Sequence, residues 1–100
     1  MNSESKSDFC ALIREVVLSE ITFDIFYERI DKFPDKNFLQ EEVVLDIYHA
    51  IQHFSIDGEL DIDRKGDNKK ALDKILEIVD CFENETVENT QLLIKQFFLL

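Results

Sequence analysis

The chain has very few residues that break or bend a polypeptide. Two glycines and one proline occur in 100 residues. β-Sandwiches and β-barrels need many tight turns and therefore many such residues, whereas long helices need few. Hydrophobic residues make up 45% of the chain, which argues against disorder. A chain of this length can form one core. We therefore predict a single helical domain over residues 1–100.

Basic residues are also scarce. The chain has 11 lysines and arginines against 22 aspartates and glutamates, and its formal net charge is −11. Such a surface repels nucleic acid and anionic lipid, since both are polyanionic. A basic protein partner is favoured, because complementary charge speeds encounter and disfavours wrong partners. Solubility alone would also account for the acidity.

Cysteine is limited to Cys10 and Cys81, which form neither a CxxC motif nor a pairing with histidine. We expect two reduced, partly buried thiols in a cytoplasmic protein. The first residues, MNSESKSDF, contain no apolar segment typical of a signal peptide. The apolar run at residues 97–100 is too short to cross a bilayer.

Apolar residues recur with helical spacing in most of the chain. The first stripe begins at Phe9, with Ser7 or Asp8 as its cap, and residues 1–8 are expected to be frayed. Thr22 is expected to cap a second helix that Pro34 ends. The stripes of the first two helices contain Phe9, Leu12, Ile13, Val16 and Val17, and Phe23, Phe26, Tyr27, Ile30 and Phe33.

Three further helices are predicted after Pro34. The third begins at Phe38 or Leu39, with Asn37 as its cap, and reaches Phe54. The fourth is capped by Asp67 or Asn68 and reaches Phe82. The fifth covers residues 86–100 and lies within residues 84–100, which are expected to be a variable C-terminal segment. The predicted fold is all-α, a single antiparallel bundle of four to five helices with an acidic loop at residues 55–66, between the third and fourth.

That acidic loop is the principal candidate binding site. Acids occupy every second position, and only Arg64 and Lys65 offset them. A second acidic cluster contains no lysine or arginine and lies near the end of the fourth helix, where acids oppose the helix dipole. The loop acids are Asp57, Glu59, Asp61 and Asp63, and the second cluster contains Glu77, Asp80, Glu83, Glu85 and Glu88. Either cluster is a candidate contact surface, and we favour the loop.

Catalytic and metal-binding patterns are missing. His49 and His53 are four residues apart but lack the glutamate of an HExxH site, so solvent exposure or contact with a partner is the better interpretation. Neither register of the acidic loop matches a calcium-binding EF-hand. Two glycines cannot build a phosphate-binding loop. We therefore predict that the protein is not an enzyme and uses no metal or cofactor.

Three segments together resemble the colicin D-type immunity proteins. They read LIREVVLSEITFDIFYERI, DIYHAIQHFSIDGEL and NKKALDKILEIVDCF, and the resemblance covers residues 9–82. The family pattern combines a Ser-plus-Ile-Thr turn, an aromatic helix with an arginine, and a helix ending in Ala-x-x-x-Phe before an acidic loop. The corresponding residues here are Ser19, Ile21, Thr22, Phe26, Arg29, Ala50, Phe54, Asp57 and Glu59.

The resemblance implies a helical protein that inhibits a tRNA-cleaving bacterial toxin. In such proteins the acidic loop occupies the toxin's basic active-site cleft, and the matching residues are Asp57 and Glu59. Gln52 stands where the family can offer an acid, and residues 84–100 have no counterpart. The implied partner is a cognate nuclease domain, bound by a monomer in a 1:1 complex. Bacteriocin immunity and contact-dependent growth inhibition both remain open.

Two other functions fit the composition. A helical adaptor or oligomerisation module would use the apolar C-terminal tip, whose residues are Phe97, Phe98, Leu99 and Leu100. We expect this tip to pack back onto the bundle instead. A DNA-mimic regulator would use the same acidic surface to block a basic DNA-binding protein.

Overall fold

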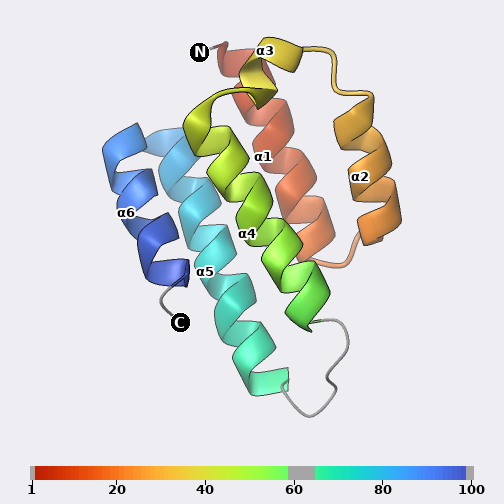
Figure 1. The fold of residues 1–100 in the computed structure, drawn as a ribbon, viewed down its shortest axis with the longest axis vertical. Coiled ribbons are helices and arrows are strands. Elements are labelled where there is room, and N and C mark those ends of the chain that lie inside the picture. Colours follow the sequence, from red (N-terminus) through yellow and green to blue (C-terminus); the bar gives the residue numbers. More distant parts are fainter. Residues whose placement is uncertain (1, 59–64, 99–100) are drawn as a thin grey trace.

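A computed structural model describes residues 2–58 and 65–98, except for the side chains of residues 53–58 and 65–69. The described chain is helical and contains no strand, which confirms the predicted all-α class. Its helices are α1 (Ser3–Val17), α2 (Phe23–Asp31), α3 (Lys36–Leu39), α4 (Glu42–Gly58), α5 (Lys65–Asn84) and α6 (Val87–Phe98) (Figure 1). The short α3 was predicted as the start of a longer third helix.

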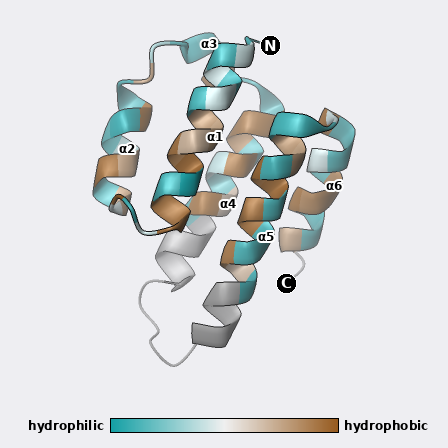
Figure 2. Cartoon of the chain, turned by 180° about the vertical axis from the view of Figure 1, so that it is seen from behind, coloured by the Kyte–Doolittle hydropathy of each residue, from teal (hydrophilic) through white to brown (hydrophobic). Residues whose placement is uncertain are grey.

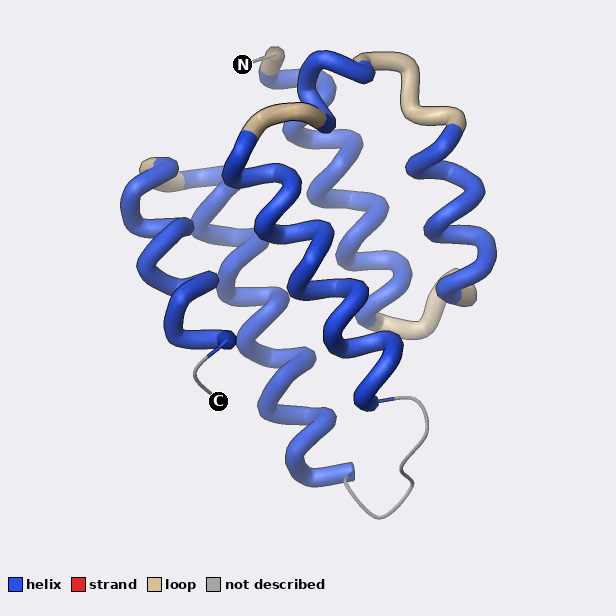
Figure 3. The backbone as a smooth tube through the Cα atoms, in the orientation of Figure 1, coloured by secondary structure: helices blue, strands red, loops and turns tan. Residues whose placement is uncertain are grey.

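Helix α5 is the element against which most of the others pack. It contacts α1, α4 and α6, while α2 packs against α1 and α6 also reaches α4. Short loops join α1 to α2, α2 to α3, α3 to α4 and α5 to α6 (Figure 3). The N-terminus and α3 lie at one end of the bundle, and the C-terminal end of α4 and the first turn of α5 lie at the other (Figure 1). None of the described helices is long and apolar enough to cross a membrane.

Helix α1 begins earlier than the sequence predicts. Asn2 is its cap, and the side-chain oxygen accepts hydrogen bonds from the backbone N–H groups of Glu4 at 2.8 Å and Ser5 at 3.3 Å. Such a cap satisfies backbone donors that the first helical turn leaves free. The prediction that residues 1–8 are frayed is therefore wrong from Ser3 onward, and neither Ser7 nor Asp8 is the cap.

Helix α1 ends in a left-handed turn at Ser19, whose φ is 62°. The backbone N–H of Glu20 donates to the carbonyl of Glu15 at 2.8 Å, and the N–H of Ser19 donates to that of Val16 at 3.2 Å. This pair of hydrogen bonds defines a Schellman motif. Glycine usually occupies the left-handed position, because a Cβ atom is disfavoured there.

The sequence predicted the cap of α2 correctly and the cap of α3 incorrectly. Thr22 caps α2, as expected, and its hydroxyl oxygen accepts from the N–H of Ile25 at 3.2 Å. Asp35, not Asn37, caps the next helix, since its carboxylate accepts from the N–H of Phe38 at 3.0 Å. Because Asp35 precedes the predicted cap, α3 begins at Lys36 and forms a separate short helix, and α4 begins at Glu42.

The predicted loop over residues 55–66 is wrong at both ends. Helix α4 continues to Gly58 and α5 begins at Lys65, so both ends of the segment are helical. Asp67 and Asn68 lie inside α5 and do not precede it. The acids of this segment alternate along the chain, a pattern that lacks helical periodicity. The sequence therefore did not predict that both ends of the segment are helical. Residues 59–64 lie outside the described part of the chain.

Phenylalanines from four elements meet in the core. The ring of Phe9 is fully buried and makes edge-to-face contacts with Phe33, Phe38 and Phe82, at centroid distances of 6.4, 5.6 and 6.5 Å. These rings come from α1, the α2–α3 connection, α3 and α5. Hydrophobic and hydrophilic segments alternate along α1 and α5 (Figure 2), as expected for helices that each bury one face.

Candidate acidic interaction surface

The principal predicted site lies mostly outside the described residues. Glu59, Asp61 and Asp63 fall within residues 59–64. Asp57 and His53 belong to the last turns of α4, but their side chains are not among those described. The C-terminal end of α4, to which Asp57 belongs, and the first turn of α5 lie at the same end of the bundle (Figure 1).

The other predicted contact groups lie one or two turns earlier on α4. Gln52 is half-buried, whereas His49 is exposed, and its ring centroid lies 6.4 Å from that of Tyr48. No group of three or more His, Cys, Asp or Glu side chains within the described ranges could hold a metal ion. His53 has no described side chain, so a role for the His49–His53 pair is not tested.

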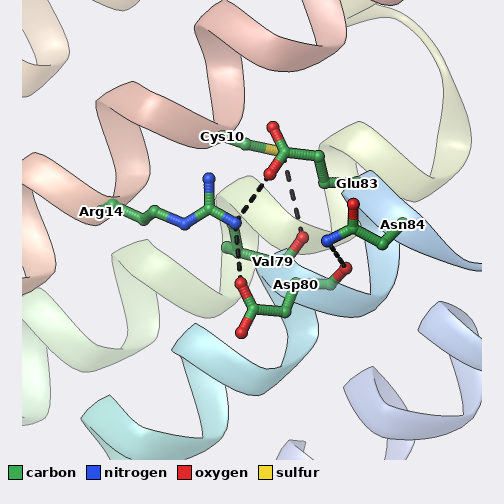
Figure 4. A network of polar contacts seen from close by, with 6 residues as sticks. All are labelled: Cys10, Arg14, Val79, Asp80, Glu83 and Asn84. Carbon is green, nitrogen blue, oxygen red and sulfur yellow. Dashed lines mark hydrogen bonds and ion pairs between the residues drawn. The ribbon is translucent and has the colours of Figure 1, made fainter.

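Two acids of the second cluster bind an arginine from a distant helix (Figure 4). Arg14 of α1 lies between Asp80 and Glu83 of α5, and its Nη2 atom is 2.7 Å from Asp80 Oδ1 and 2.9 Å from Glu83 Oε1. The side-chain hydrogen bond to Asp80, followed by that to Glu83, raises the pKa of Arg14. Asp80 and Glu83 therefore have a structural role, because their ion pairs with Arg14 join α5 to α1.

The rest of that cluster is differently placed. Glu77 lies 3.5 Å from Lys74 Nζ, in an ion pair within α5. Glu85 and Glu88 are exposed and have no ion-pair partner among the described side chains. The sequence alone could not separate these acids, because Arg14 lies far from them along the chain. Glu85 and Glu88 are the two members free to meet an external cation.

Most described basic side chains are already engaged. Arg29 Nη1 is 2.8 Å from Glu15 Oε2, and Lys32 Nζ is 2.8 Å from Glu28 Oε1. Lys6 Nζ lies 5.1 Å from the centroid of the Phe82 ring, a cation–π contact. Because these few basic side chains are already paired or packed within the protein, they do not offset the other acidic residues of the surface.

The two cysteines lie in the interior. Cys10 and Cys81 are both buried and not disulfide-bonded, which confirms their expected burial. Cys10 Sγ contacts the carbonyl oxygen of Val79 at 4.0 Å (Figure 4). Desolvation by burial, followed by the charge of Glu83, raises the pKa of Cys10 to about 12. A thiol with so high a pKa is a poor nucleophile at neutral pH.

Sequence reasoning missed a groove between α4 and α6. Glu42 and Asp46 of α4 and Glu88 of α6 are among its lining residues. Glu42 lies in the first turn of α4, where an acid is favourable for the helix dipole alone. The signal lay in the spacing, since residues four apart share one helix face, as Glu42 and Asp46 do, and as Glu88 and Leu92 do. Only the fold shows that these faces of α4 and α6 line the same groove.

No family of known proteins, no curated protein and no solved structure matches this chain.

Proposed function

We propose that this protein is a bacterial immunity protein that binds and neutralises a cognate basic nuclease toxin, which cleaves tRNA. The proposal rests on one observation, the excess of carboxylates in a small helical domain with a net charge of −11. A nuclease cleft must be basic to hold phosphates, and carboxylates on helix ends compete for the same cations. The resemblance at Asp57 and Glu59 supports the same assignment.

The contact surface in this proposal is the acidic segment between α4 and α5. Asp57, Glu59, Asp61 and Asp63 enter or cover the cleft, with His53 and Gln52 at the edge of the contact. The toxin performs the chemistry, and the immunity protein acts by occupying its active site as a monomer in the cytoplasm. Capture is electrostatically steered, so its rate falls as ionic strength rises.

The test is inhibition of a cognate ribonuclease. This protein is co-purified with the product of the adjacent upstream gene and then titrated into that product's tRNA-cleavage assay. We expect stoichiometric loss of cleavage that high salt weakens. The double variant Asp57→Lys/Glu59→Lys should lose inhibition, whereas the matched control Glu20→Lys/Asp24→Lys, which reverses one exposed Glu and one exposed Asp elsewhere, should retain it.

A third variant decides between the two acidic clusters. Glu85→Lys/Glu88→Lys reverses only acids without an ion-pair partner among the described side chains, so it avoids the Arg14 contacts that join α1 to α5. Loss of inhibition in this variant, with Asp57→Lys/Glu59→Lys still active, would move the contact to the second cluster. Absence of both complex and inhibition would overturn the proposed function.

A second candidate function is an oligomerisation module. Leu92 and Phe98 of α6 are 58% and 48% exposed, and together they offer apolar surface that a second copy could cover. In the C-terminal tip, which was expected to pack onto the bundle, Phe97 is buried but Phe98 is not, and Leu99 and Leu100 lie outside the described residues. Sedimentation over a range of protein concentrations tests this alternative, since a module of this kind would self-associate. A DNA-mimic regulator differs only in its partner, which would be a basic DNA-binding protein.

A further inference from the structure

An open groove of about 810 Å³ runs between α4 and α6. Helix α4 contributes Glu42 and Asp46, and α6 contributes Glu88, Leu92, Lys95 and Phe98. The two helices pack directly against each other, so the groove has a continuous protein floor. Ile94, which is 5% exposed, lies within that floor.

Apolar surface remains uncovered in this groove. Leu92 is 58% exposed and Phe98 is 48% exposed, although Ile94 and Phe97 on the same helix are buried. Helix α6 therefore buries one apolar face in the bundle and presents further apolar side chains to the groove. Such a surface gains free energy when another apolar face covers it.

The charged residues of the groove are predominantly acidic. Glu42, Asp46 and Glu88 have no ion-pair partner among the described side chains. Lys95 is the one basic residue among the described side chains that line the groove. Asp46 is half-buried while the two glutamates are exposed, so carboxylates lie on both helices beside the exposed apolar side chains.

We propose that the α4–α6 groove binds a basic amphipathic helix of a partner protein. Apolar side chains of that helix cover Leu92 and Phe98, and its lysines or arginines pair with Glu42, Asp46 and Glu88. Recognition of an amphipathic helix in a groove follows the same physical rules elsewhere, with anchors three and four residues apart. None of the described residues that line the groove belongs to the acidic segment between α4 and α5.

Charge selects this occupant over the alternatives. A second copy of the chain carries the same net charge of −11, and like charges across a contact are repulsive. Nucleic acid and anionic membranes are disfavoured for the same reason. An uncharged apolar helix would cover Leu92 and Phe98 but would leave three carboxylates beside it without cations. A helix with one apolar face and one basic face covers the exposed apolar side chains and also pairs with the carboxylates.

The test uses a synthetic helical peptide of leucines and lysines, with leucine at every third or fourth position. Two control peptides are one of the same composition in scrambled order and one with glutamate in place of lysine. Calorimetry measures affinity, and amide chemical shifts locate the contact. We expect saturable 1:1 binding of the amphipathic peptide, with shifts confined to α4 and α6, and much weaker binding of both controls.

Matched variants separate local recognition from overall charge. Glu42→Gln/Asp46→Asn/Glu88→Gln should weaken binding by about tenfold, since exposed ion pairs each contribute modestly. Glu4→Gln/Glu20→Gln/Asp24→Asn removes the same charge from exposed positions elsewhere and should leave affinity within about twofold. Leu92→Ser, at an exposed position, should also weaken binding without disturbing the core.

Two outcomes would overturn this proposal. Equal weakening by both triple variants would show that the peptide responds only to net charge. Amide shifts outside α4 and α6 would place the contact on another surface. Because the peptide is not a nuclease, either result leaves the proposed inhibition of a toxin untouched, and failure of toxin inhibition leaves the groove untouched.

Discussion

Ser5 and Asp35, which lie 30 residues apart in sequence, are joined by a hydrogen bond of 2.8 Å from the Ser5 hydroxyl to Asp35 Oδ2. The other oxygen of the same carboxylate caps α3 by accepting from the N–H of Phe38. One side chain therefore both starts α3 and holds the first turn of α1 beside it. Ser5 is buried in this contact, which explains why the N-terminal residues are helical.

Stability should fall in acid through Asp35. The backbone N–H of Phe38, followed by the Ser5 hydroxyl, holds the pKa of this carboxyl below its ordinary value of 3.8. A lowered pKa in the folded state gives stability that is present above the unfolded pKa and lost as pH falls through the folded pKa. We expect Asp35→Ala to lower the urea midpoint at pH 7 and to have a smaller effect near pH 3. Equal effects at both pH values would contradict this account.

Ser19→Gly should stabilise the protein by about 0.5–1 kcal/mol. Serine at a φ of 62° bears a conformational cost of about 1–2 kcal/mol that glycine avoids, and the extra freedom of glycine in the unfolded chain offsets about 0.4–1 kcal/mol. Thermal unfolding measures the change. Ser19→Val provides the opposite test, since a β-branched residue is least tolerated there. A lower melting temperature for Ser19→Gly would refute the assignment of strain.

Arg14→Met should destabilise the protein by about 1–2 kcal/mol, because two carboxylates lose one shared partner. The matched control is Lys32→Met, which removes an exposed ion pair with Glu28 and should cost about 0.5 kcal/mol or less. A double-mutant cycle with Asp80→Asn isolates the interaction between Arg14 and Asp80. Equal losses for Arg14→Met and Lys32→Met would mean that the contact between α1 and α5 contributes no more than a surface pair.

Cys10 should be unreactive in the folded protein. With a pKa of about 12, only about one thiol in 10⁴ is ionised at pH 8. In a Cys81→Ala background, an aromatic disulfide reagent should label Cys10 slowly under native conditions and rapidly in 6 M urea, where the thiol regains its ordinary pKa. The converse background, Cys10→Ala, reports on Cys81. Rapid native labelling of Cys10 would show that α1 separates readily from α5.

The sequence predicted the helical class and most of the core because apolar spacing is a local property. The stripe from Phe9 to Val17 and the cap at Thr22 are both confirmed. The start of α1 was missed because it depends on Asn2 and on the Ser5–Asp35 contact, which joins distant residues. Asp35 and Asn37 compete as caps after Pro34, and composition alone does not show which one the fold uses.

The candidate sites were harder to predict than the fold. Acidic residues could be counted, but the sequence does not show which of them the fold neutralises. Asp80 and Glu83 looked unpaired until Arg14 was placed beside them. The α4–α6 groove depends on two helix faces that are more than 40 residues apart at Glu42 and Glu88. The toxin-binding role of the acidic segment remains a prediction.

The contact between α1 and α5 has a consequence for synthesis on the ribosome. Arg14 meets Asp80 across 66 positions of the chain, and Phe9 meets Phe82 in the core. The apolar stripe of α1 therefore has no α5 surface to cover it until Lys65–Asn84 has been translated. Contacts of α5 with α4 and α6 join segments much closer in sequence and can form with shorter loops. The docking of α1 onto α5 must therefore wait for that segment, and Phe9 is an apolar site that a chaperone can bind during the interval.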